Sequence, residues 1–274
     1  MRMIAIGDNV VDCYLDQKIY YPGGNAVNVA VGCKRDGFDE VAYMGVFGDD
    51  PEAFHIQWAL SQEGISTLRS RHMHAISGHP AVQLMPGGDR AFVGGPKDTA
   101  QHIVRIRLMP YYLAYISKFD ICHTSCYSAI EPELPKLKDA CDVSFDFSND
   151  SQRPDYLAQV CPHVRFAFFS GSHLTDLQID TLITTVHGYG TEIVGITLGE
   201  KGALFSRHGK PYLQGIKPVK VIDTMGAGDS FIAGFLTRYV HGATMEEALD
   251  FAADCAAITC TYHGGFGYGK PFET

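Results

Sequence analysis

The stretch "VIDTMGAGDSFIAGF" at residues 221–235 places an aspartate directly after a Gly-Ala-Gly turn and before an apolar run. Glycine-rich turns that open a helix bind phosphate, because their amides and the helix dipole attract anions. A permanent carboxylate at Asp229 would repel that anion unless it performs chemistry. Phosphoryl transfer to a hydroxyl group needs both parts, because the turn stabilises the phosphoryl charge while the carboxylate accepts the hydroxyl proton. The turn consists of Gly226, Ala227 and Gly228. On these residues alone, an aspartate that merely caps the helix is an equally good interpretation.

Two other nucleotide-binding patterns are incomplete. The dinucleotide fingerprint G-x-G-x-x-G needs a third glycine where Phe231 stands, which weakens a dehydrogenase interpretation. "GGFGYGK" at 264–270 matches part of a P-loop, but Pro271 follows it in place of Ser or Thr. We therefore interpret it as a glycine-rich tail.

Outward from this stretch, apolar runs rich in Val, Ile and Phe alternate with helical patterns. We expect strands at 3–7, 41–46, 120–125, 143–148, 166–171 and 192–199, and helices at 25–35, 51–63, 131–140 and 175–187. This alternation predicts βαβ units, and hence an α/β fold with a mostly parallel sheet between two layers of helices. For the last part we expect a strand at 218–222 and helices at 228–240 and 244–262, with Thr244 capping the second helix.

Two segments, about 9–21 and 73–95, break this rhythm. They look like strands and turns with no crossover helix, and the Gly87-Gly88 pair predicts a hairpin turn. We interpret them as a small β lid inserted into a single domain that spans 1–274.

Composition excludes several classes of protein. The chain has 274 residues, of which 46% are hydrophobic and 19% charged, an ordinary globular balance. A net charge of −9 argues against a nucleic-acid partner. The first residues do not resemble a signal peptide and no run is long enough to span a membrane, so we expect a cytoplasmic protein without a membrane partner. The eight cysteines lack metal-ligand spacing, and we expect reduced, mostly buried thiols.

Three further motifs could bind ligands. "YPGGNAVNVAVGCKRDG" at 21–37 is a glycine turn leading into a helix, and Asn28 lies one turn into it, where it could bind a polyol. Asp12 follows the first expected strand, at the edge where open parallel sheets bind ligands. "TLGEKG" at 197–202 is a strand end followed by glycine turns, which could hold a nucleotide. Each also has a plainer interpretation, respectively a capped amphipathic helix, a solvated loop aspartate and a tight turn.

Together these stretches resemble the ribokinase-like (pfkB-type) carbohydrate kinase family over nearly the whole chain. "PGGNAVNVA" is similar to the N-terminal signature of the family, and "DTMGAGDSFIAGF" to its C-terminal one. The resemblance implies a ribokinase-like three-layer sandwich and the use of ATP and Mg²⁺.

The resemblance also implies roles for individual residues. It implies that Asp229 is the catalytic base and that the turn 226–228 is an anion hole. The residues expected to bind the sugar are Asp12, Gly23, Gly24 and Asn28, and those expected to contact ATP are Thr197, Gly199 and Gly202. Asp223 matches a position near the bound ion in family members that a monovalent cation such as K⁺ activates.

The chain departs from the family pattern in two places. The Asn-x-x-Glu motif, which helps organise magnesium and phosphate, is replaced by "SGSH" at 170–173. Many ribokinases have lysine where this chain has Asn25.

Within the family, several stretches, among them "IGDNVVD" and "CAAITCTYHGG", look most like fructoselysine 6-kinases. This implies phosphorylation of the terminal hydroxyl of a ketose derivative, a sugar–amino acid adduct. We expect the lid stretch 85–98 to sense the adduct, with Arg90 as a contact, and two copies of the chain to pair through the lid. The alternatives are a fructokinase or nucleoside kinase of the same fold, or a nucleotide- or sugar-binding regulator without catalysis.

Overall fold

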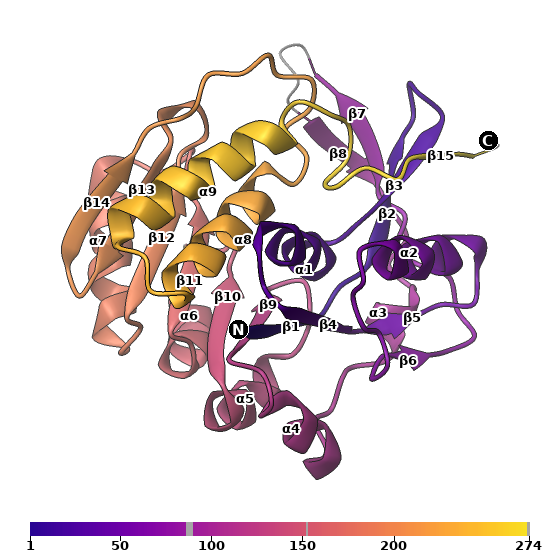
Figure 1. Cartoon of the computed structure of the whole chain (residues 1–274), viewed down its shortest axis with the longest axis horizontal. Helices are drawn as coiled ribbons and strands as arrows, with labels where there is room; N and C mark the ends of the chain where they lie inside the picture. Colours follow the sequence, from indigo (N-terminus) through magenta and orange to yellow (C-terminus); the bar gives the residue numbers. More distant parts are fainter. Residues whose placement is uncertain (86–89, 152, 273–274) are drawn as a thin grey trace.

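The centre of the protein is an eight-stranded sheet between two layers of helices (Figure 1). The computed structural model describes residues 1–85, 90–151 and 153–272. The strand order is β14-β13-β12-β11-β10-β9-β1-β4. The bounds are β1 (Arg2–Ile6), β4 (Glu40–Met44), β9 (Ile121–Ser125), β10 (Asp142–Asp146), β11 (Phe166–Ser170), β12 (Ile193–Thr197), β13 (Ala203–Arg207) and β14 (Lys210–Gln214). All neighbours from β4 to β12 are parallel, and β13 and β14 are antiparallel additions at one edge. The expected mostly parallel α/β sandwich is confirmed.

The helices divide between the two faces of this sheet. Along β1, Met3 and Ala5 pack in one buried cluster while Ile4 and Ile6 pack in the other, because side chains of a strand alternate between faces. One cluster includes α1 (Asn25–Asp36), α2 (Pro51–Gln62), α8 (Ala227–Val240) and α9 (Met245–Thr259). The other includes α4 (Pro110–Ile116), α5 (Leu134–Ala140), α6 (Pro154–Val160) and α7 (Asp176–Gly188), with the short α3 (Ala100–Ile103) at its margin. Strands buried on both faces explain the continuous apolar runs of the sequence.

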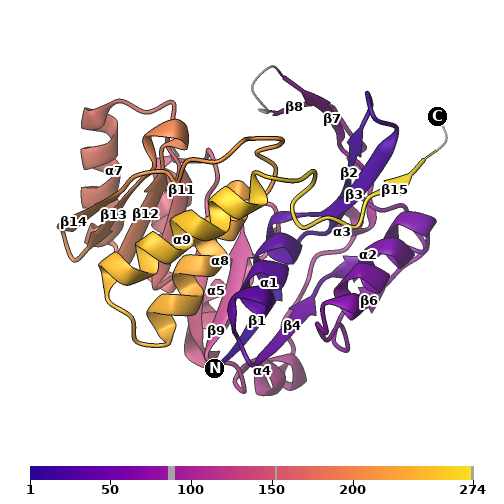
Figure 2. The same ribbon diagram turned by 45° about the horizontal axis from the view of Figure 1, so that its top comes forward.

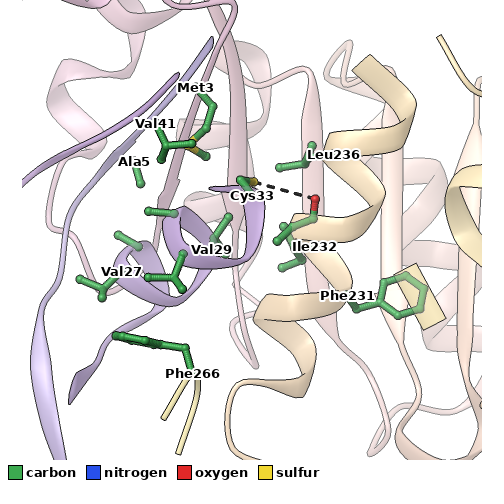
Figure 3. Close-up of a cluster of buried hydrophobic side chains, with 14 of the residues drawn as sticks. Met3, Ala5, Val27, Val29, Cys33, Val41, Phe231, Ile232, Leu236 and Phe266 are labelled. Carbon is green, nitrogen blue, oxygen red and sulfur yellow. Dashed lines mark hydrogen bonds between the residues drawn. The ribbon is translucent and has the colours of Figure 1, made fainter. Parts of the chain in front are cut away.

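Helices α1 and α8 pack directly against each other, and this contact positions the site described below. Val29 of α1 and Ile232 of α8 lie in one buried cluster, and the Cys33 thiol contacts the carbonyl of Ala233 at 3.9 Å (Figure 3). A Cβ at Gly32 would lie 2.6 Å from that of Ala233, so glycine lets the two helices approach closely. Burial of a side chain such as Ile232 contributes roughly 1.5–3 kcal/mol.

Helix caps follow the sequence closely. Thr244 accepts a hydrogen bond from the Glu247 amide, and the Glu247 side chain accepts one from the Thr244 amide, which forms a capping box at the start of α9. The expected cap at Thr244 is therefore confirmed. Thr175 and Gln178 form the same arrangement at the start of α7.

A second sheet projects from the carboxyl edge of the first (Figure 2). Its order is β15-β3-β2-β7-β8. The bounds are β2 (Val10–Tyr14), β3 (Ile19–Gly23), β7 (Ala81–Leu84), β8 (Arg90–Gly94) and β15 (Lys270–Pro271), and a separate pair is formed by β5 (Val46–Phe47) and β6 (Arg71–His72). Strands β7 and β8 are antiparallel, as the hairpin prediction requires, but the Gly87-Gly88 turn lies outside the described residues. The lid function of this sheet, the single-domain assignment and the pairing of two copies remain predictions.

The expected strand at 218–222 is wrong. This segment has no regular structure, and the amides of Ile222 and Asp223 both donate to the Cys260 carbonyl, not to a neighbouring strand. The Val221 and Ile222 side chains are about two-fifths exposed, so the apolar pattern here does not reflect burial in a sheet.

All eight cysteines are free thiols. Across the described ranges, none of the helices combines the length and the apolar character that crossing a membrane would require.

Candidate active site

A cavity of about 380 Å³ lies where the second sheet faces the carboxyl ends of the main strands. Asp8 follows β1, and Asp146, Ser170 and Thr197 end β10, β11 and β12. The second sheet contributes Val10, Asp12 and Phe92, and the starts of α1 and α8 close the remaining side. This is the edge at which open parallel sheets bind ligands.

Asp229 lies in the first turn of α8 and faces this cavity. The helix follows Gly226, whose φ of 73° lies in the left-handed region, and a Cβ there would be 2.7 Å from the Gly265 Cα. Both oxygens of the carboxylate are held by amides from α1. The Asn25 Nδ2 donates to Oδ1 at 2.8 Å and the Asn28 Nδ2 donates to Oδ2 at 2.7 Å. The orientation of the Asp229 carboxylate is therefore set before any ligand binds.

The orientation of Asn25 is set in turn by a buried histidine. Its Nδ2 donates to Asp146 at 2.7 Å as well as to Asp229, so its Oδ1 must face the His123 Nε2 at 3.0 Å. That nitrogen must carry the proton, and the His123 Nδ1 then accepts from the Ser144 hydroxyl at 2.9 Å. Burial lowers the pKa of His123 to about 3, which keeps the ring neutral at physiological pH. A chain of neutral donors thus connects the centre of the sheet to two carboxylates.

Asp146 is a buried carboxylate of the cavity whose pKa is raised well above its ordinary value. It is 7% exposed, and its Oδ1 accepts from the Ser148 amide at 2.8 Å. Burial, and after it the charge of Asp229, raises the pKa of Asp146 to about 7. Burial also raises the pKa of Asp8. The Asp8 carboxylate accepts a hydrogen bond from the backbone amide of Asn25 at 2.7 Å. Four carboxylates line the cavity, those of Asp8, Asp12, Asp146 and Asp229, and the described lining includes no Lys, Arg or His side chain.

The structure brings most of the predicted site residues together. Those that line the cavity are Asp12, Gly24, Asn28, Thr197, Gly226, Gly228 and Asp229. The backbone of Arg90 pairs with Leu84, but its side chain lies outside the described structure.

Four predicted residues lie beside the cavity and not in its lining. Gly23 adjoins Asp12, and a Cβ there would meet the Asp12 carboxylate at 2.4 Å. The Ala227 amide donates to the Thr224 carbonyl at 3.2 Å, so it serves the turn. Gly199 and Gly202 bound the 3₁₀ turn after β12, both with positive φ.

Asp223 lies in the turn before α8 and does not line the cavity. It is fully buried, and its Oδ2 accepts from the Tyr14 hydroxyl at 2.5 Å and the Gly264 amide at 2.9 Å. Its Oδ1 accepts from the Met225 amide at 2.9 Å. These three donors hold the Asp223 carboxylate in the turn before α8, and its position near a monovalent cation remains a prediction.

Sequence reasoning missed two lining carboxylates, Asp8 and Asp146. Each is a polar residue at the carboxyl end of an apolar strand, in "IAIGDN" and "VSFDFS", and that position was the available signal. Asn25 stands where many ribokinases have lysine, and no neighbouring residue in the sequence indicates that it contacts two carboxylates.

Comparison with solved structures identifies the fold. The structure is similar to the ribokinase of Giardia lamblia (TM-score 0.82, 20% identity, covering 97% of this chain and 95% of the other). It is also similar to the Arabidopsis thaliana ribokinase complexed with ribose and ATP (TM-score 0.80, 22% identity, covering 96% and 93%). These similarities identify a ribokinase-like fold.

The family follows from the sequence comparison. The family model described as pfkB family carbohydrate kinase matches residues 5–267, and the chain belongs to that family. It is 45% identical over 273 residues to the fructosamine kinase FrlD of Bacillus subtilis (strain 168), covering 100% of this chain and 95% of the relative. It is 35% identical to the fructoselysine 6-kinase of Escherichia coli (strain K12), covering 97% and 100%. The protein is thus a sugar kinase, a phosphotransferase that acts on a sugar hydroxyl.

Proposed function

We propose that the protein transfers the γ-phosphoryl group of ATP to the terminal hydroxyl of a fructosamine, with fructoselysine as substrate and fructoselysine 6-phosphate as product. The observation that carries the substrate is the 45% identity, over the whole chain, with a protein named fructosamine kinase. The acidic lining of the cavity supports it, because a fructosamine brings a positive charge that a plain hexose lacks.

Asp229 is the general base of this proposal. The sugar oxygen forms a bond to the γ-phosphorus, the bond from that phosphorus to the bridging oxygen breaks, and the hydroxyl proton passes to the Asp229 carboxylate while ADP leaves. The start of α8 favours the ionised carboxylate. The donors on Asn25 and Asn28 hold it in one orientation.

The amides of the glycine turn form the anion hole. Gly226 and Gly228 line the cavity, whereas Ala227 does not and its amide is bonded to Thr224. We therefore assign the phosphoryl group to the two glycines, at the helix N-terminus where negative charge is stabilised.

The sugar is held by residues of the second sheet and of α1, next to Asp229. The Asp12 carboxylate is 3% exposed and accepts sugar hydroxyls, with Gly23 and Gly24 allowing the backbone to come close. The Asn28 Oδ1 is buried and has no hydrogen-bond partner among the described residues, so a ligand hydroxyl would satisfy it. Arg90 remains a candidate for the carboxylate end of the adduct.

The nucleotide lies along the ends of β11 and β12. Thr197 and Ser170 line this part of the cavity, and Gly199 and Gly202 shape the turn beyond it. Within the described ranges no group of three His, Cys, Asp or Glu side chains could hold a metal ion. That fits Mg²⁺, which binds phosphates and keeps several waters, better than it fits a metal with a protein cage. When bound, Mg²⁺ would neutralise phosphate charge.

One assay tests this function. ADP release is measured over fructoselysine, fructose, ribose and adenosine, with the Asp229→Asn variant as the inactive control. We expect kcat/KM for fructoselysine to exceed that for fructose. Equal or better use of fructose would indicate a fructokinase, and selective use of ribose or adenosine would contradict the substrate. If no alcohol releases ADP, a non-catalytic regulator is the better explanation.

A further inference from the structure

Asp146 is a buried charge to which the proposed reaction gives no role. It lies in the cavity, 7% exposed, and it accepts hydrogen bonds from two neutral donors, the Asn25 side chain and the Ser148 amide. No Lys, Arg or His side chain among the described residues pairs with it or lines the cavity. A buried carboxylate without a cation is costly, and proteins retain such groups mainly at functional sites.

The surroundings of Asp146 do not balance its charge. Its two oxygens accept from the Asn25 side chain and the Ser148 amide, and neither donor carries a positive charge. Burial and the nearby Asp229 raise the pKa of Asp146 to about 7, which shows that its surroundings disfavour the ionised form. A ligand cation would remove that penalty.

We propose that the Asp146 carboxylate binds the secondary ammonium of the fructosamine and so makes the enzyme select aminated ketoses over neutral ones. This inference rests on the proposed function, because only a fructosamine carries a cation next to its sugar carbons. It places amine recognition in the floor of the cavity, in addition to the lid.

The distances allow one substrate to reach both carboxylates. The accepting oxygens of Asp146 and Asp229 share the Asn25 Nδ2 at 2.7 and 2.8 Å, so they lie less than about 6 Å apart. A single ketose ring could then present its terminal hydroxyl to Asp229 and its aminated carbon to Asp146.

The same end of the cavity offers a path for the amino acid part. Ser148, whose amide binds Asp146, accepts a hydrogen bond from the Tyr127 hydroxyl at 2.8 Å. Tyr127 lines the cavity and is 57% exposed, so Asp146 lies close to a solvent-facing rim. The lysine chain would leave the cavity past Tyr127.

The test separates the ammonium from the rest of the substrate. Initial rates are measured with 1-deoxy-1-propylamino-fructose, which carries the ammonium but no amino acid, and with its neutral ether counterpart 1-O-propyl-fructose. One hydrogen bond to a charged group is worth about 1.5–3 kcal/mol, or roughly 10- to 150-fold. The wild type should therefore prefer the amine by about that factor in kcat/KM, mostly through KM. Asp146→Asn should abolish the preference, so that its kcat/KM for the amine no longer exceeds its kcat/KM for the ether, whatever the common change in rate on both substrates.

The control is Asp139→Asn, which removes the same charge from an exposed position on α5 and should behave as the wild type. An equal loss on both substrates would overturn the proposal and indicate that Asp146 serves the reaction or Mg²⁺. Equal use of amine and ether by the wild type would overturn it without any variant. Neither result depends on whether fructoselysine is preferred to fructose, which decides the proposed function separately.

Discussion

Replacement of Asp146 by Asn should stabilise the protein, and the gain should grow with pH. The folded protein holds a proton on Asp146 up to a pKa of about 7, against an ordinary value of 3.8, so the folded state binds this proton more tightly than the unfolded chain. The stability from this group is therefore complete below about pH 4 and is lost as the pH rises to 7. Each pH unit in that window corresponds to 1.36 kcal/mol, which makes the full loss about 4 kcal/mol.

The asparagine variant has no charge to lose. It keeps one acceptor oxygen for the two donors and loses one hydrogen bond, a cost of about 1 kcal/mol that does not depend on pH. Between pH 5 and pH 8 the difference in unfolding free energy between variant and wild type should widen by about 2–3 kcal/mol. The charges of Asp229 and Asp8 are among the causes of the raised pKa of Asp146, so relief of their repulsion is part of this difference.

The measurement is urea unfolding followed by circular dichroism at pH 5, 6, 7 and 8, for the wild type, Asp146→Asn and Asp139→Asn. The surface variant should keep a constant difference from the wild type, within about 0.5 kcal/mol. Parallel pH curves for Asp146→Asn and the wild type would refute the reasoning, since they would mean that Asp146 titrates normally. A more stable variant that no longer prefers the amine would show stability given up for recognition.

Four further variants test the proposed base, the two glycines of the turn and the sugar site. Asp229→Asn should lower kcat by about 10²–10⁴-fold with ATP and sugar binding retained, as measured by calorimetry; a nearly normal kcat would make Asp229 a helix cap. Gly228→Ala should lower kcat by about 10²–10³-fold with little loss of stability, because its Cβ meets no protein atom within 4 Å. Gly226→Ala should instead lower the melting temperature, because Gly226 has a positive φ and an added Cβ would clash with the Gly265 backbone. Similar melting temperatures for the two glycine variants would contradict the view that only Gly226 is structurally required. Asp12→Ala should raise the KM for the sugar far more than that for ATP, and equal changes would count against sugar binding.

Much of the fold could be predicted from local patterns. The apolar runs correspond to strands because a parallel sheet covered on both faces requires continuous hydrophobic segments. The cap at Thr244 was predictable because its partner, Glu247, is three residues away. The one misassigned strand, 218–222, has the same local pattern but no neighbouring strand to pair with, and pairing is not a local property.

The sequence by itself determined that a glycine turn and an adjacent carboxylate lie together at 226–229, because these residues are contiguous along the chain, and it predicted a role for them in phosphoryl transfer. Only the tertiary structure decided what surrounds Asp229. Asn25 contacts Asp146 and Asp229 at separations of 121 and 204 residues, and its orientation depends on His123 of β9. The raised pKa of Asp146 depends on burial and on a second carboxylate, both of which exist only after folding. Hydrogen-bond partners and local dielectric are properties of position in space, and no spacing along the chain encodes them.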